Sequence, residues 1–185
     1  QQSVCVIIEA YRTHGHLEAA LDPLGTVRPA CPELALETHG LTPADLSREF
    51  ATGTLPLPAT ATLADIVGVL RETYCGSVGA EFGYVSCRER RAWLQERMEG
   101  ARNRAQIERS TRLRLLEKLQ RADSFENFLA TRYIGKKRFG LEGGEALLVV
   151  LDQVLERAAQ SGAQQCIMGM AHRGRVNVLH NVAGK

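Results

Sequence analysis

Several features that would assign this chain to a common class of protein are absent from its sequence. Aromatic residues make up only 5% of the 185 residues, and the formal net charge is only +2. A nearly neutral chain creates no strong overall field that would attract nucleic acid or an anionic membrane. No apolar run approaches the ~20 residues of a transmembrane helix, and no signal peptide opens the sequence. We therefore expect neither a membrane nor a nucleic acid as partner.

The cysteines and histidines lack the spacing of a disulfide framework or a metal site. The five cysteines are odd in number and contain no C-x-x-C pair, which indicates a reducing compartment. His14 and His16 do not share a helix face and have no third ligand nearby, so we interpret them as partly exposed imidazoles at a helix end. Cys75 has no adjacent His or Lys in the sequence, and we interpret it as a buried structural thiol.

Helical periodicity dominates what the sequence does contain. Apolar residues recur at helical spacing in residues 4–13, 62–74, 88–121, 122–133 and 146–159. Thr62 is the expected N-cap of the second helix. Residues 26–61 are rich in Pro, Thr and Gly, and they predict an irregular segment that wraps over a larger body, interrupted by one short helix capped by Thr42. In the basic stretch 88–121, interleaved arginines and glutamates are typical of a solvated helix face.

The stretch 166–183 combines two patterns joined by a polar turn. Its first five residues form an apolar run typical of a buried strand, and its last part has apolar residues at helical spacing. His172, Arg173 and Arg175 lie in the turn between them. In α/β sheets ligands bind at the carboxyl ends of strands, and a helix N-terminus favours anions. This placement predicts a site for a small, multiply anionic ligand such as a diphosphate or a carboxylate. The alternative is a solvated basic turn.

Two long motifs resemble those of one enzyme family. They are Lys-Arg-Phe-Gly-Leu-Glu-Gly-Gly-Glu at residues 137–145 and Gly-Met-Ala-His-Arg-Gly-Arg-Val-Asn-Val-Leu at residues 169–179. Further segments agree in the same order at residues 10–16, 21–25, 70–76 and 91–97. From its first residues to its last, the chain resembles the thiamine-diphosphate-dependent, decarboxylating component of 2-oxoglutarate dehydrogenase. Two positions depart from the family: Tyr84 stands where a histidine is usual, and Gly140 where a serine is usual.

The resemblance implies a fold and a reaction. The chain would be the N-terminal section of an α/β enzyme. In it, a mostly helical region at residues 1–139, with the wrapping segment inside it, leads into the first βα unit of a transketolase-like thiamine-diphosphate-binding domain at residues 140–185. The enzyme would decarboxylate 2-oxoglutarate and pass the succinyl group to a lipoyl group on a partner succinyltransferase. It would be a homodimer in the bacterial cytoplasm or the mitochondrial matrix.

The resemblance also assigns roles to residues. His172 would be catalytic and would contact the oxo acid, Arg173 would bind the substrate or the cofactor, and Arg175 would fix the loop. Magnesium would accompany thiamine diphosphate, but the Gly-Asp-Gly to Asn-Asn metal motif of thiamine enzymes is absent from the sequence. We therefore expect the metal ligands, and the partners of the strand at 166–170, to follow Lys185. The 185-residue piece alone is expected to be inactive.

Two alternatives stay open at the level of sequence. The first is a paralogue that prefers 2-oxoadipate, since one extra methylene changes specificity by only ~1–3 kcal/mol. The second belongs to another class: a non-catalytic module whose arginine-rich helices dock onto a partner or bind nucleic acid. The interleaved glutamates and the scarcity of aromatic residues argue against nucleic-acid binding.

Overall fold

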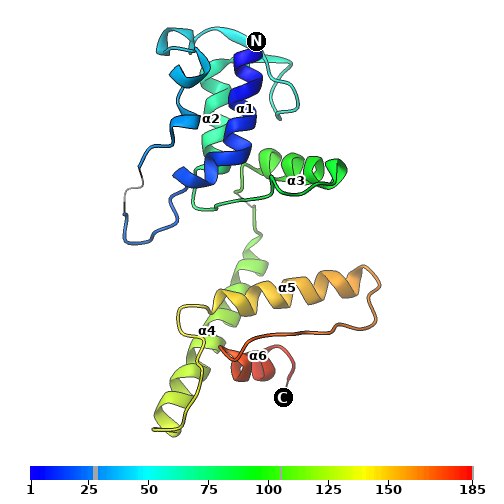
Figure 1. Ribbon diagram of the computed structural model, residues 1–185. Helices are drawn as coiled ribbons and strands as arrows, with labels where there is room; N and C mark the ends of the chain where they lie inside the picture. Colours follow the sequence, from blue (N-terminus) through cyan, green and yellow to red (C-terminus); the bar gives the residue numbers. More distant parts are fainter. Residues whose placement is uncertain (27–28, 105, 185) are drawn as a thin grey trace. The chain divides into compact units, whose positions relative to one another are not determined.

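The computed structural model describes residues 1–26, 29–104 and 106–184 (Figure 1). The chain divides into two compact units, unit 1 at residues 1–105 and unit 2 at residues 106–185. The structure is mixed but mostly helical, with one two-stranded sheet, and this agrees with the coarse class expected from the sequence. Among the described helices, none has the length and apolar character needed to cross a membrane. The start of a cofactor-binding domain at residue 140 stays a prediction.

Two helices form the centre of unit 1. Helix α1 (Gln2–His14) packs against α2 (Leu63–Tyr74), beside which it lies in Figure 1. Their apolar stripes meet in the core, where Val4, Ile7, Ile66 and Leu70 are all fully buried. Thr62 caps α2, as predicted, by accepting a hydrogen bond from the backbone N–H of Asp65 at 3.1 Å. Helix α3 (Arg88–Ala101) packs against α2.

The segment between α1 and α2 consists of short turns and a hairpin that contact these two helices. Four short 3-10 turns follow α1: η1 (Gly15–Glu18), η2 (Pro32–Leu34), η3 (Glu37–His39) and η4 (Pro43–Asp45). The predicted cap of η4 is present, since the Thr42 N–H donates to the Asp45 carboxylate at 2.9 Å. In addition, β1 (Glu49–Ala51) pairs antiparallel with β2 (Thr60–Thr62) in a hairpin that no pattern in the sequence predicts. Strands of three residues are too short to show an alternating pattern.

Two predictions for unit 1, one for Cys75 and one for residues 81–86, have different outcomes. Cys75 is partly buried, and burial raises the pKa of its thiol to about 11. Little thiolate therefore exists near neutral pH, which supports the structural interpretation. The bulky residues within 81–86 predict a short extended segment, but this stretch contains a turn in which the Val85 N–H donates to the Phe82 carbonyl at 3.0 Å. Tyr84 lies in this turn and is exposed.

A buried ion pair joins the three helices of unit 1. Arg12 of α1 donates from Nε to Glu99 Oε1 at 2.7 Å and from Nη2 to Oε2 at 2.9 Å. The Tyr74 hydroxyl of α2 donates to Glu99 Oε1 at 2.7 Å. Burial, and then the adjacent carboxylate, raise the pKa of Tyr74, so its hydroxyl keeps the proton that it donates. Glu99 is only 1% exposed, and its assignment to a solvated helix face is wrong.

Unit 2 contains three helices around a small core. Helix α4 (Arg109–Arg132) packs against α5 (Ala146–Gln160) and α6 (Arg175–Asn181). The buried core consists of Ala122, Leu141, Leu148 and Val178. The spacing of Leu113, Leu116 and Leu119 predicts a buried stripe on the first half of α4, and this is wrong for Leu113 and Leu116, which are exposed. Two short helices cannot cover every apolar side chain of a 24-residue helix.

The buried strand expected at residues 166–170 is not formed. This stretch has no strand pairing, and Ile167 is 97% exposed. A strand needs a neighbour that pairs its N–H and C=O groups, and the described part of unit 2 contains no other strand. The transketolase-like sheet therefore stays a prediction.

We expect Glu99→Ala to lower the free energy of unfolding of unit 1 by ~3–5 kcal/mol, because Arg12 would stay buried without its partner. The single tryptophan, Trp93, lies on α3, so its fluorescence during a urea titration reports on this unit. The control is Glu96→Ala, at an exposed position of the same helix, which should change the value by less than ~0.5 kcal/mol. Equal effects of the two substitutions would contradict this interpretation of the ion pair.

Candidate anion-binding site

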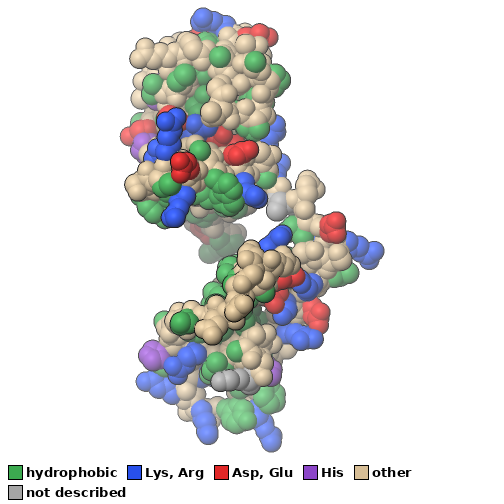
Figure 2. Space-filling model, turned by 90° about the vertical axis from the view of Figure 1, so that its right-hand side faces the viewer, with side chains coloured by type: hydrophobic (Ala, Val, Ile, Leu, Met, Phe, Trp, Pro, Cys, Tyr) green, Lys and Arg blue, Asp and Glu red, His purple; other side chains and the backbone are tan. Residues whose placement is uncertain are grey.

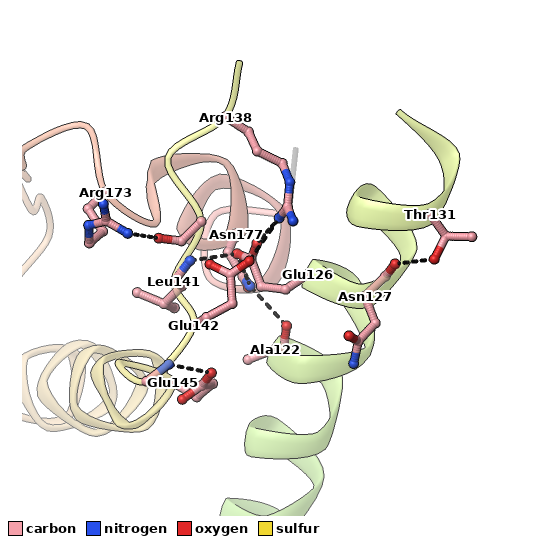
Figure 3. Close-up of polar contacts among 12 residues, drawn as sticks. Ala122, Glu126, Asn127, Thr131, Arg138, Leu141, Glu142, Glu145, Arg173 and Asn177 are labelled. Carbon is pink, nitrogen blue, oxygen red and sulfur yellow. Dashed lines mark hydrogen bonds and ion pairs between the residues drawn. The ribbon is translucent and has the colours of Figure 1, made fainter. Parts of the chain in front are cut away.

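The two motifs that carry the family resemblance meet in unit 2. The backbone N–H of Gly174 donates to the carbonyl of Phe139 at 2.8 Å. Arg173 donates from Nη1 to the carbonyl of Gly140 at 3.1 Å, a contact drawn in Figure 3. Residues 138–142 and 171–175 are separated in the sequence by α5, yet they form one continuous surface. The structure thus brings His172 and Arg173 together with the glycine-containing loop.

His172 is exposed on this surface, and its ring stacks on Phe139. The two ring centroids lie 5.4 Å apart, and their planes are inclined by 29°. On the same Phe139 ring, Lys137 Nζ lies 5.6 Å from the centroid. Within the part of unit 2 that is described, neither ring nitrogen of His172 is engaged in a hydrogen bond. The stacking therefore orients the imidazole and leaves both nitrogens available to a ligand.

Positive charge gathers around His172. The segments 136–142 and 171–175 contain Lys136, Lys137, Arg173 and Arg175, and Figure 2 shows Lys and Arg side chains gathered toward the lower end of unit 2. In the described residues, the only ion pairs of these loops are those of Arg138, with Glu126 and Glu142. The other four cations are therefore not neutralised by carboxylates. Such a surface attracts a ligand that carries several negative charges.

The sequence predicts that Arg175 fixes the loop. This is wrong, because Arg173 makes the side-chain contact with the loop at residues 138–142. Within residues 106–184, the Arg175 side chain makes no hydrogen bond or ion pair, and it lines an apolar groove of about 320 Å³ together with Met168 and Leu179. Arg173 uses one guanidinium N–H for the carbonyl of Gly140. A guanidinium has five N–H donors, so Arg173 can hold the loop and still bind an anion.

Gly174 allows the two loops to approach each other closely. It has φ +73°, and a Cβ at this position would collide with the side chain of Leu141. Within the other loop, the carboxylate of Glu142 lies beside Gly140, at the end of a flexible side chain.

Beneath the loops lie two buried polar residues that the sequence analysis did not single out. Glu126 of α4 is 4% exposed, and Asn177 of α6 is fully buried. The Asn177 Nδ2 donates to Glu126 Oε1 at 2.9 Å. No pattern in the sequence indicates that Glu126 is its partner.

The donor groups of the surface fit an anion rather than a metal ion. Guanidinium, ammonium and imidazole groups suit a phosphate or a carboxylate. In the described residues of the chain, no group of three His, Cys, Asp or Glu side chains is arranged to hold a metal. Glu126, the carboxylate beneath the loops, is already bonded to Arg138 and Asn177. The loops could hold the diphosphate or carboxylate end of a ligand, while magnesium would need other ligands.

Comparison with known proteins shows which proteins the chain resembles. No family model matches it. It is 44% identical over 187 aligned positions to a 2-oxoglutarate dehydrogenase E1 component of Azotobacter vinelandii and 42% identical over 182 positions to one of Brucella ovis. These alignments cover 100% and 97% of the chain. The chain is therefore a relative of oxo acid dehydrogenase components.

More narrowly, the chain is homologous along its whole length to a section of the 2-oxoglutarate dehydrogenase E1 component, which confirms the family resemblance. It spans only 20% of the Azotobacter protein and 18% of the Brucella protein.

We expect Gly174→Ala to separate the two loops. An alanine with positive φ costs ~1–2 kcal/mol wherever it occurs, and at this position its methyl group would also collide with Leu141. The matched control is Gly162→Ala, which has φ +89° but no neighbouring atom within 4 Å. Hydrogen–deuterium exchange should become faster at residues 138–142 and 172–178 in Gly174→Ala only. Equal protection of these segments in the two variants would contradict the close contact.

Proposed function

We propose that this chain is the N-terminal section of a 2-oxoglutarate dehydrogenase E1 component. The complete enzyme would decarboxylate 2-oxoglutarate with thiamine diphosphate and magnesium, and pass the succinyl group to a lipoyl group on a partner acyltransferase. The observation that supports this most is the meeting of residues 137–145 and 169–179 at one cationic surface around His172. The whole-length similarity to E1 components supports the same function. A homodimer in the bacterial cytoplasm or the mitochondrial matrix is part of the proposal.

The residues of this chain would bind and orient the charged groups. Thiamine diphosphate, when bound, supplies the electron sink for decarboxylation. Arg173 is anchored at the carbonyl of Gly140 and would direct its remaining donors to a carboxylate or a phosphate. His172 is oriented by Phe139 and would donate a hydrogen bond or a proton to an oxygen on which negative charge develops. Lys137 would raise the local concentration of anionic substrate.

The alternative functions gain no support from the structure. On α4, cations that could have contacted phosphates are paired with acids: Arg114 with Glu156 at 2.6 Å, Lys118 with Asp152 at 2.9 Å, and Arg121 with Glu117 at 2.7 Å. Paired cations contribute little to the counterion release that drives nucleic-acid binding. The names of the similar proteins support 2-oxoglutarate, rather than 2-oxoadipate, as the substrate.

In the full-length enzyme, we expect His172→Ala to lower kcat with 2-oxoglutarate by ~10²–10³, because one positioned donor near developing charge is lost. The affinity for thiamine diphosphate should change far less. The control is His39→Ala in unit 1, where the ring is bonded to the carbonyl of Glu33 at 2.8 Å, and this variant should keep its activity. Steady-state kinetics and cofactor titration measure both quantities. A folded His172→Ala enzyme with near-normal kcat would show that the turn is structural.

Arg173→Ala should weaken binding of the anion with which Arg173 pairs. We expect the KM for 2-oxoglutarate, or the Kd for the cofactor, to rise about tenfold or more, as is typical when a hydrogen bond to a charged group is lost. Arg173→Lys should not restore the wild-type value, because a point charge cannot both hold the Gly140 carbonyl and bind an anion through a planar fork. Arg112→Lys, at an exposed position of α4, is the control. Full recovery in Arg173→Lys would mean that charge alone matters at this position.

A further inference from the structure

We propose that Glu126 is a positioning residue for the cationic surface. Its carboxylate holds the loop at residues 138–142 against α4 and α6, and the loop in turn holds Arg173 and orients His172. The proposal rests on the proposed function for its kinetic test, whereas its structural test is independent of the reaction.

The Glu126 carboxylate accepts hydrogen bonds from two different segments (Figure 3). Oε1 accepts from the Leu141 backbone N–H at 3.1 Å and from Asn177 Nδ2 at 2.9 Å. Oε2 accepts from Arg138 Nη1 at 2.9 Å. Arg138 and Leu141 belong to the loop, and Asn177 belongs to α6. One side chain of α4 therefore fixes both segments that flank the cationic surface.

Asn177 fixes the rotation of α6 about its own axis. Its Nδ2 also donates to the carbonyl of Ala122 at 3.0 Å, and its Oδ1 accepts from Asn181 Nδ2 at 2.7 Å. The donors and the acceptor of the amide are thus used in one orientation, which sets the rotation of α6 about its axis. Because Arg173 and Gly174 immediately precede α6, this rotation also determines where they lie.

The buried charge is explained better by positioning than by stability. Burying a carboxylate is costly unless it is paired, and well-packed apolar residues in the place of a buried ion pair are often at least as stable. An apolar side chain at position 126 would fill the space but could not accept from the Leu141 N–H. The carboxylate therefore fixes the position of the Leu141 backbone, which apolar packing alone would not do.

The two residues before Leu141 in the sequence contact the candidate site directly. The preceding carbonyl, of Gly140, accepts from Arg173 at 3.1 Å. The carbonyl of Phe139 accepts from the Gly174 N–H at 2.8 Å, and the Phe139 ring stacks on His172. A shift of Leu141 would therefore displace the anchor of Arg173 and the ring that orients His172 together. In the described part of unit 2, Glu126 makes no hydrogen bond or ion pair with His172 or Arg173, so it acts through the loop.

The kinetic test uses the full-length enzyme. Glu126→Gln removes the charge but keeps one acceptor oxygen, and we expect it to lower kcat/KM for 2-oxoglutarate at least tenfold. Arg138→Gln should act in the same direction, and the double variant should lose less than the product of the single effects, because the two residues share one contact. Glu117→Gln, an exposed glutamate of α4 paired with Arg121, is the matched control and should behave as wild type.

A rescue separates positioning from a general loss of stability. Glu126→Asp keeps a carboxylate that can accept from the loop and from Asn177, so it should retain part of the kcat/KM that Glu126→Gln loses. Should Glu126→Gln fail to fold, Arg138→Gln alone gives the test, because it leaves Glu126 bonded to Leu141 and Asn177. Unchanged kcat/KM in a folded variant measured well below its Tm would overturn the proposal.

Hydrogen–deuterium exchange gives the structural test. In Glu126→Gln, exchange should become faster at Leu141 and in residues 172–175, while the middle of α5 keeps its protection. If His172→Ala keeps full activity, the proposed function fails, but this change in exchange would still support positioning by Glu126. If the protection of these residues is unchanged, the positioning role is wrong whatever reaction the enzyme catalyses.

Discussion

The arrangement of unit 2 depends on how the charge of Glu126 is compensated. A carboxylate that is 4% exposed has lost most of its water, so protein donors must replace that water in fixed directions. The donors come from the loop and from α6. Unit 1 uses the same solution, since the buried carboxylate of Glu99 collects Arg12 from α1 and Tyr74 from α2. In both units, a buried acid defines how elements that are distant in the sequence meet.

The helices could be predicted because their apolar residues repeat with the period of the helix. The expected ranges 4–13, 62–74 and 146–159 correspond to α1, α2 and α5 within one or two residues. Caps at Thr42 and Thr62 could be predicted for a similar reason, since a cap is a local hydrogen bond between residues three apart. Features that depend only on residues close together in the sequence could therefore be predicted from the sequence.

The rest depends on contacts that no local pattern contains. Glu99 has the appearance of a surface acid among arginines, and only Arg12, 87 residues away, makes its burial possible. The apolar run at residues 166–170 fits a buried strand, but a strand also requires a partner, and the run is exposed without one. Helical spacing likewise predicted that Leu116 is buried, but the described neighbours do not cover its side chain, and it is exposed.

The candidate site shows the same division between chemistry and geometry. His172 and Arg173 could be chosen from the sequence, because an imidazole beside a guanidinium at the start of a helix suits an anion whatever surrounds it. The loop is held by Arg173 and not by Arg175. This contact depends on the position of the Gly140 carbonyl, which the sequence does not specify. The stacking of His172 on Phe139 depends in turn on that loop. These contacts form without a paired strand at residues 166–170, so the arrangement of the cationic surface depends on the hydrogen bonds of its loops and not on a sheet.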